Sequence, residues 1–216
     1  MKKTIYLLGI ASAIIFSACK SDSPNNNTPS AYLANFRSTI DTVHDFAADT
    51  AIVGFGAQGP IYAGKFTFYS LENDSMVSTL DSATTKWDIA FSGTYIRVNN
   101  TISGPGIGGG FVYNGLFNSL TGVPRDSSFK TDVTFPNNLA IPWGSGKGWY
   151  TYVGPPTNLI NPIPGKVLII KTASGKYAKV EIMNYYLGGV TPDASATDME
   201  KAMKQRYYTF RYSLSN

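Results

Sequence analysis

Three aromatic residues in one loop region, Trp149, Tyr150 and Tyr152, carry most of the chemistry that this sequence could offer a ligand. They lie in PNNLAIPWGSGKGWYTYVGPPTNLINPIP (residues 136–164), where the density of proline and glycine excludes central strands and long helices. Rigid β scaffolds commonly carry their binding function on such loops. The rings look exposed in this setting, so we expect them either to line a mostly apolar binding site or to cap one end of the core.

The sequence offers little for catalysis. His44, the sole histidine, precedes Asp45, but no G-x-S-x-G elbow accompanies them, so a surface histidine near a helix end is the better interpretation. Met199 and Met203 are four residues apart and share one face of a predicted short helix. We interpret this pair as core contacts rather than as soft ligands, and Met183 lies in the middle of a predicted strand. Aspartate and glutamate occur without a convincing acid–base pair, and we predict that the protein is not an enzyme.

A glycine-rich segment, SGPGIGGG (residues 103–110), satisfies the dinucleotide pattern G-x-G-x-x-G at Gly104, Gly106 and Gly109. That fingerprint requires a helix after the glycines, because the N-terminal N–H groups of the helix bind the pyrophosphate. The following residues, FVYNG, instead indicate a strand and a turn, and Pro105 removes one N–H donor. We therefore expect a tight turn in which glycine permits close backbone packing, and no nucleotide site.

The first 18 residues have the features of a lipoprotein signal peptide. Lysines precede an apolar run over residues 5–16, which is too short to span a bilayer as a ~20-residue helix. The following Phe-Ser-Ala-Cys is similar to a bacterial lipobox, so Cys19 is the expected lipidation site. The polar segment 19–30 is expected to be a flexible tether for a single folded domain, residues 31–216.

Charge and cysteine content narrow the possible partners. Without Lys2 and Lys3 of the signal, 16 of the 18 basic residues remain against 14 acidic ones. Because the charge is nearly balanced and no Lys/Arg cluster is present, we expect no nucleic acid partner. Cys19 is the only cysteine, so no intramolecular disulfide can form. The 14 tyrosines and 12 phenylalanines fit an exported β protein.

Alternation of apolar and polar residues predicts strands through most of the domain. The segment WDIAFSGTYIRVN (residues 87–99) predicts a strand pair, and we expect Trp87 to be a buried anchor on the same face as Ile89 and Phe91. The strongest hairpin is predicted over residues 166–186, where KVLIIKT and YAKVEIMNYY flank a short turn.

Helical spacing occurs at two places. Apolar residues three and four apart within residues 32–44 predict a short amphipathic helix, followed by a loop over residues 45–59. A second short helix is predicted within residues 188–205, with Ser195 or Thr197 as its N-cap. The predicted fold class is therefore mostly antiparallel β with one or two short helices.

Four motifs in this order, WDIAFSGTYIRVN, SGPGIGGG, PGKVLIIKTASGKYAKVEIMNYY and RYYTFRY, resemble the HmuY family, the haem-binding surface lipoproteins of Bacteroidetes. The resemblance covers about residues 62–212. It implies an antiparallel HmuY-like β fold, anchored to the outer membrane through a lipid on Cys19 and exposed at the cell surface. It also implies that the protein sequesters haem or a related tetrapyrrole for iron acquisition and passes it to an outer-membrane haem receptor.

The resemblance further implies two histidine or two methionine ligands to the haem iron, from loops between the glycine-rich turn and the PGK hairpin. The corresponding residues here, 117–164, contain no histidine, methionine or cysteine, so neither ligand set can be carried over. Iron also accepts tyrosinate, which leaves Tyr150 and Tyr152, beside Trp149, as candidate substitutes. The alternative is a surface lipoprotein on the same scaffold that lacks iron ligation and binds a protein or glycan through its aromatic loops.

Overall fold

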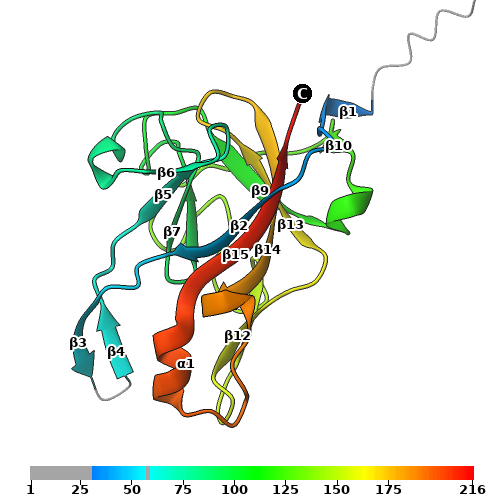
Figure 1. Cartoon of the computed structure of the whole chain (residues 1–216). Helices are drawn as coiled ribbons and strands as arrows, with labels where there is room; N and C mark the ends of the chain where they lie inside the picture. Colours follow the sequence, from blue (N-terminus) through cyan, green and yellow to red (C-terminus); the bar gives the residue numbers. More distant parts are fainter. Residues whose placement is uncertain (1–30, 57–58) are drawn as a thin grey trace, which may run out of the picture.

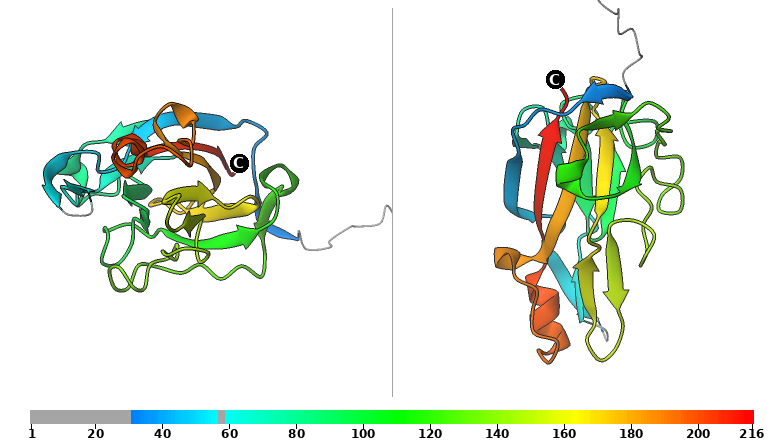
Figure 2. Two further views of the ribbon diagram at one scale, coloured as in Figure 1. Left: turned by 90° about the horizontal axis from the view of Figure 1, so that it is seen from below. Right: turned by 90° about the vertical axis from the view of Figure 1, so that its right-hand side faces the viewer.

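The computed structural model describes residues 31–56 and 59–216, which form two packed antiparallel β-sheets with three short hairpins or strand pairs around them (Figures 1 and 2). The larger sheet contains, in spatial order, β2 (Asp41–Ala47), β15 (Gln205–Leu214), β14 (Tyr177–Tyr186), β13 (Lys166–Lys171) and β9 (Gly109–Asn114). The smaller sheet contains β6 (Ser75–Val77), β5 (Thr67–Ser70), β7 (Ile89–Ser92) and β8 (Tyr95–Val98). The predicted fold class, mostly antiparallel β with short helices, is confirmed.

Shorter elements complete the fold. The two-stranded pairs are β1 (Tyr32–Asn35) with β10 (Gly122–Pro124), β3 (Ile52–Gly56) with β4 (Gly59–Tyr62), and β11 (Tyr150–Val153) with β12 (Leu159–Pro162). The described residues contain one α-helix, α1 (Asp198–Lys204), and three single 3-10 turns, η1 (Thr79–Asp81), η2 (Phe117–Ser119) and η3 (Leu187–Gly189). None of the helices in these ranges is long and apolar enough to span a membrane.

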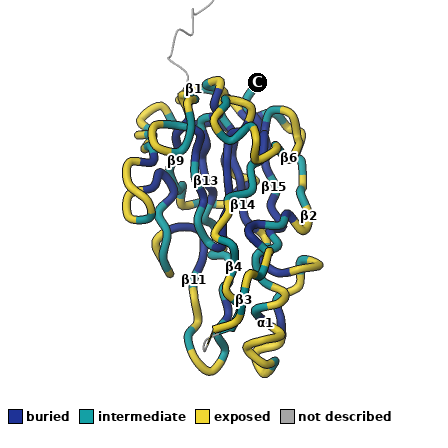
Figure 3. Tube along the Cα trace, turned by 90° about the vertical axis from the view of Figure 1, so that its left-hand side faces the viewer, coloured by how far each residue is buried: buried dark blue, intermediate teal, exposed yellow. Residues whose placement is uncertain are grey.

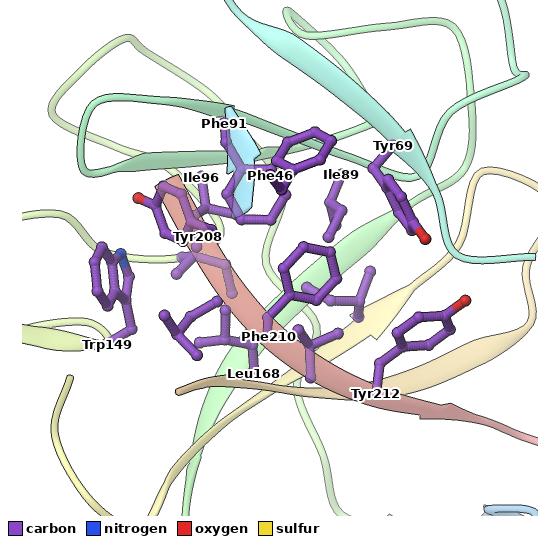
Figure 4. Close-up of a cluster of buried hydrophobic side chains, with 14 of the residues drawn as sticks. Phe46, Tyr69, Ile89, Phe91, Ile96, Trp149, Leu168, Tyr208, Phe210 and Tyr212 are labelled. Carbon is purple, nitrogen blue, oxygen red and sulfur yellow. The ribbon is translucent and has the colours of Figure 1, made fainter. Parts of the chain in front are cut away.

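The main core lies between the two sheets and is dominated by aromatic rings (Figure 4). Phe46 of β2 meets Tyr69 and Phe91 of the smaller sheet edge-on, with ring centroids 5.5 and 5.3 Å apart. Phe91 also stacks on Phe210 of β15 at 5.5 Å. Edge-on and offset contacts are the favourable geometries for aromatic pairs, so these rings join the sheets specifically as well as through buried apolar area.

A second, smaller core covers the opposite face of the larger sheet, with residues such as Phe117, Val167 and Ile169. Lys179 of β14 is buried there and donates hydrogen bonds from Nζ to the carbonyl oxygens of Phe117 and Leu120, at 2.9 and 2.8 Å. Burial lowers the pKa of Lys179, because the charged form loses hydration. The two carbonyls compensate part of this loss, so a lysine can occupy an otherwise apolar layer.

A buried carboxylate ties the turns of the two sheets together. Asp88 accepts hydrogen bonds from the backbone N–H groups of Leu71, at 2.8 Å, and Ala173, at 2.9 Å. Leu71 follows β5 in the smaller sheet, and Ala173 lies in the turn between β13 and β14 in the larger one. Burial raises the pKa of the Asp88 carboxyl, and these donors oppose that shift.

The predicted helix over residues 32–44 is wrong. This segment forms β1 and the start of β2, and the two strands pair with different partners, β10 and β15. The apolar residues at helical spacing do not share a face, since Phe36 is buried whereas Leu33 and Ile40 are exposed. The spacing arose from two separate strands and the connection between them.

Trp87 is completely buried, as predicted, but the prediction of its face is wrong. Ile89 and Phe91 belong to the main core, whereas Trp87 packs edge-on against Phe68, with centroids 4.9 Å apart. Its Nε1 donates to the carbonyl oxygen of Ser82 at 2.9 Å. Trp87 therefore anchors the outer side of the smaller sheet and the loop beneath it.

The glycine-rich segment is a turn built around a buried side chain, Asn99. Its Nδ2 donates to the carbonyl of Trp87 at 2.8 Å, and its Oδ1 accepts from the N–H of Gly106 at 2.9 Å. A Cβ at Gly104 would overlap the Asn99 amide and the Trp87 ring, so glycine is required there. Strand β9 follows the turn. A dinucleotide site requires a helix at this position.

The predictions for the C-terminal third are confirmed. Residues 166–186 form the β13–β14 hairpin, with Leu168 opposite Val180 and Ile170 opposite Ala178. Thr197, one of the two predicted caps, accepts a hydrogen bond from the N–H of Glu200 and forms a capping box at the start of α1.

Candidate functional site

Three elements project from the same end of the sandwich: the β3–β4 hairpin, the β11–β12 hairpin and α1 (Figure 1). The chain enters the described region at β1 and ends after β15 at the opposite end (Figure 1). We refer to the end that carries the three projections as the distal end. Exposed and intermediate residues predominate along these projections, whereas buried residues concentrate in the sheets above them (Figure 3).

The distal end exposes many large apolar side chains. The β3–β4 hairpin carries the most prominent of them, since Phe55 is 65% exposed and Val53 is 66% exposed. The exposed apolar side chains on the three projections are Val53, Phe55, Ile61, Tyr152, Val153, Met199 and Met203. Scattered exposed apolar residues are ordinary, but their concentration on neighbouring projections is typical of an interaction site.

A cavity of about 510 Å³ lies between the β11–β12 hairpin and α1. It is lined by Tyr152, Asn158, Ile160, Asp198, Lys201, Ala202 and Gln205. Its volume falls in the range of small-molecule sites, about 300 to 1,000 Å³. The lining combines the Tyr152 ring and two aliphatic side chains with polar groups from both elements.

Hydrogen bonds fix the walls of this cavity relative to each other. Tyr152 Oη donates to Asn158 Oδ1 at 2.7 Å, and Asn158 Nδ2 donates to Asp198 Oδ1 at 3.0 Å. On the other side of α1, Tyr62 Oη of β4 donates to the carbonyl oxygen of Ala202 at 2.6 Å. The helix is thus held between the two hairpins, and all three projections belong to one connected structure.

A cluster of ionic and aromatic contacts positions α1 and β15 against β4. Arg206 Nη1 lies 2.6 Å from Asp49 Oδ2, and the Arg206 guanidinium covers the Tyr62 ring at 3.5 Å from its centroid. Gln205 Nε2 donates to Tyr62 Oη at 3.1 Å. Because the Asp49 side chain is almost fully buried, this charge-assisted contact fixes the start of the helix–strand junction more strongly than an exposed ion pair would.

Lys201 places a positive charge at the cavity wall. Its side chain is almost fully buried, its Nζ donates to the carbonyl oxygen of Ala194 at 2.8 Å, and it lies 3.9 Å from Asp198 Oδ1. An ammonium group has three donors, so one remains for an anionic group that enters the cavity.

The three predicted aromatic site residues do not share one environment. Trp149 is 2% exposed and Tyr150 is 6% exposed, and both pack in the main core, so the expectation of exposed rings is wrong for them. Trp149 lies against Tyr150, Tyr185 and Tyr208, with centroids 4.9 to 5.6 Å apart. Trp149 Nε1 also donates a hydrogen bond to the carbonyl oxygen of Thr94 at 3.1 Å, which satisfies its polar group within the structure.

Exposure separates the roles of the two tyrosines, since the hydroxyls of both make hydrogen bonds within the structure. Tyr150 Oη accepts from the N–H of Gly144 at 3.2 Å and lies 3.3 Å from Thr94 Oγ1, so its hydroxyl is used within the structure. Tyr152 is 47% exposed and lines the distal cavity. Of the three predicted residues, Tyr152 is the one with a side chain available to a ligand.

The other candidate ligands are exposed rather than buried. Met183, Met199 and Met203 are about half exposed, so the interpretation of Met199 and Met203 as core contacts is wrong. His44 is exposed on β2, not near a helix end. Cys19 lies outside the described residues. Within residues 31–56 and 59–216, no group of three or more His, Cys, Asp or Glu side chains could hold a metal ion.

A bound porphyrin iron would therefore depend on single donors. Tyr152 supplies a phenolic oxygen at the cavity, and Met199 and Met203 supply thioether sulfurs on exposed positions of α1. Haem iron accepts both donor types. Of these donors, Tyr152 is the one that lines the cavity, so it is the donor that the iron of a porphyrin bound there would reach.

Several residues of the distal site had no signal strong enough to predict them. Tyr62, Lys201 and Gln205 are distant in sequence from the aromatic loop, and nothing in their local pattern indicates that they meet it. The β3–β4 hairpin was expected to be a loop, although apolar residues alternate with glycine in IVGFG. That alternation was the available signal for an exposed hairpin.

The comparison with protein families gives one match. The sequence model of the HmuY protein family matches residues 63–200. A crystal structure of the apo HmuY analogue of Tannerella forsythia is similar with a TM-score of 0.48 and 16% identity, covering 84% of this chain and 97% of that one. Apo PinO from Porphyromonas gingivitis is similar with a TM-score of 0.45 and 14% identity, covering 83% and 99%. No curated protein matches the sequence.

Proposed function

Because the chain belongs to the HmuY family, we propose that it is a lipid-anchored protein of the outer cell surface that binds haem or a related tetrapyrrole for uptake. In this proposal the protein acts by binding rather than catalysis, and an outer-membrane haem receptor takes over the ligand. The observation that supports it best is the concentration of exposed apolar side chains on the three distal projections, two of which enclose a cavity.

The distal end offers the chemical groups that a porphyrin requires. The ring faces are apolar and would contact Tyr152 and Ile160 in the cavity lining, while the Lys201 ammonium would pair with a propionate. Tyr152 is the proposed iron ligand, since its hydroxyl is at the cavity and its side chain is half exposed. Ferric iron supplies the Lewis acid that a phenolate would ligate.

The first experiment compares haemin with metal-free protoporphyrin IX in titrations of the purified protein, followed by absorbance and by quenching of tryptophan fluorescence. We expect saturable binding of haemin at micromolar concentration with a high-spin ferric spectrum. Tyr152→Phe should abolish that spectrum while leaving affinity for protoporphyrin. Tyr150→Phe is the matched control, because the Tyr150 side chain is buried in the main core, and it should leave the spectrum unchanged.

A second pair of variants tests the apolar surface. Ile160→Ala should weaken the binding of both compounds by roughly tenfold or more, since each buried carbon that the change removes from the cavity lining contributes about 0.8 kcal/mol. Leu80→Ser removes an apolar side chain that is 92% exposed on η1 and should have no effect. If neither haemin nor protoporphyrin gives a saturable change, the tetrapyrrole proposal is wrong, and a scaffold that binds another partner remains.

A further inference from the structure

The outer face of the smaller sheet carries a second group of aromatic side chains, distant in sequence from the distal hairpins. Tyr95 of β8 packs against Phe135 and Trp143, with centroids 5.1 and 5.3 Å apart. Phe66 meets Phe135 edge-on at 5.9 Å. These residues come from three segments of the chain and form a continuous aromatic strip beside β8.

Arg97 of β8 lies within this strip. Its guanidinium carbon is 4.1 Å from the centroid of Phe66 and 4.3 Å from that of Phe135. Because the two centroids are themselves only 5.9 Å apart, the rings lie on adjacent sides of the guanidinium rather than on opposite faces. One side of the group therefore stays open for a ligand.

Among the described residues, Arg97 lacks a counter-ion in contact with it. Its Nε is buried and has no hydrogen-bond partner there. The neighbouring acid, Asp132, already accepts hydrogen bonds from Val98 N at 3.0 Å, Ser103 Oγ at 2.7 Å and Ala140 N at 2.8 Å. Burial lowers the pKa of Arg97 and the charge on Asp132 opposes that shift, but a guanidinium stays protonated at neutral pH.

Arg97 also forms part of the wall of an open cavity of about 500 Å³. Thr101 and Ser103, in the same wall, both donate their hydroxyl protons inward to Asp132, so their oxygens remain available to accept hydrogen bonds from a ligand. Phe68 and Pro105 add apolar wall. The cavity thus presents a cationic donor, hydroxyl acceptors and a flat apolar surface together.

We propose that this cavity binds an acidic sugar, a pyranose that carries a carboxylate, through an ion pair between the carboxylate and Arg97. The planar guanidinium matches a carboxylate, the Thr101 and Ser103 oxygens accept from sugar hydroxyls, and Phe68 contacts the apolar face of the ring. A phosphate is a poorer match, because Arg97 is the one cation in the cavity lining. This site is independent of the distal cavity and of tetrapyrrole binding.

The test is a titration of the purified protein with D-glucuronic acid, followed by chemical-shift changes in NMR spectra or by calorimetry. Saturable binding is expected, with D-glucose and inorganic phosphate each at least about tenfold weaker, the lower limit for loss of a charge-assisted hydrogen bond. Arg97→Gln should weaken glucuronate binding by a similar factor. Lys166→Gln removes a positive charge from β13 in the other sheet and should leave it unchanged.

Thermal unfolding of Arg97→Gln checks that the variant is folded, and if it is not, the comparison of glucuronate with glucose on the unaltered protein decides alone. Equal binding of glucuronate and glucose would overturn the ion pair with Arg97. Equal binding of phosphate would overturn the choice of a carboxylate. The absence of saturable binding by glucuronate would overturn the site.

Discussion

At the scale of single residues, Asp74 makes an unusual contact with two core tyrosines. Its Oδ1 accepts hydrogen bonds from Tyr69 Oη at 2.6 Å and from Tyr212 Oη at 2.7 Å, and these bonds lower the pKa of the carboxyl. The two tyrosines belong to different sheets, so the carboxylate joins the sheets at the edge of the core. Burial and the same carboxylate raise the pKa of both phenols, which keeps them protonated as donors.

The Asp74 contact predicts a pH dependence of stability. A carboxyl with a lowered folded-state pKa stabilises the fold above its unfolded pKa, about 3.9, and loses that contribution as pH falls through the folded value. Asp74→Asn should therefore lower the free energy of unfolding near pH 7, and the difference from the unaltered protein should shrink near pH 3. Denaturant melts at the two pH values measure it. If the two proteins differ in free energy of unfolding by the same amount at pH 7 and pH 3, the charge on Asp74 does not contribute to stability.

Trp87 allows a second prediction at this scale. Its ring is completely buried against Phe68, and truncation of a buried tryptophan to alanine typically costs about 3 to 5 kcal/mol. We expect Trp87→Ala to lose stability in this range in denaturant melts, whereas Leu80→Ala, at a side chain that is 92% exposed, should change it by less than about 0.5 kcal/mol. A loss below about 1 kcal/mol for Trp87→Ala would contradict the anchoring role.

At the scale of elements, α1 is short and depends on its cap. Thr197 Oγ1 accepts from the N–H of Glu200 at 3.2 Å, and Glu200 Oε2 accepts from the N–H of Thr197 at 2.9 Å. Thr197→Ala should cost about 1 kcal/mol and speed amide hydrogen exchange in α1. Ser195→Ala is the matched control, because Ser195 bonds to Asp193 instead of the helix. If both variants exchange at the same rate as the unaltered helix, the capping box does not stabilise α1.

The sequence predicted those elements in which the apolar residues of the local pattern are also the residues buried in the fold. In β13 and β14 the alternating residues Leu168, Ile170, Val180 and Ile182 all reach the main core, so pattern and fold coincide. The predicted helix over residues 32–44 was wrong because two strands with different partners together produced helical spacing of apolar residues. Local patterns contain no information about which later strand will pair with them.

The expected exposure of Trp149 and Tyr150 was wrong for a similar physical reason. Both residues lie among prolines and glycines, a setting that indicates a surface loop, yet Trp149 packs in the core against Tyr185 and Tyr208, and Tyr150 packs against Trp149. Whether a ring in an irregular segment turns inward depends on space left by distant strands. Tyr152 lies two residues further along β11, where the strand has left the core and its side chains become exposed, and it lines the distal cavity.

At the scale of the whole molecule, the distal site depends on chain topology. The β3–β4 hairpin, the β11–β12 hairpin and α1 are separated by long stretches of sequence, but the sandwich directs all three to one end (Figures 1 and 2). Each projection alone would expose apolar residues without a partner. Together, linked through Tyr62, Asn158 and Asp198, they form one structure with a cavity.

This arrangement gives a prediction about anchoring and orientation. The described chain begins at β1, at the end opposite to the projections (Figure 1), so a lipid on Cys19 would leave the distal site directed away from the membrane. The unaltered protein should partition into the detergent phase, and Cys19→Ser should remain in the aqueous phase. An epitope inserted within residues 154–157, in the β11–β12 turn, should be stained on intact cells. Equal partitioning of the two proteins would refute lipidation, and staining that requires permeabilised cells would place the site in the periplasm.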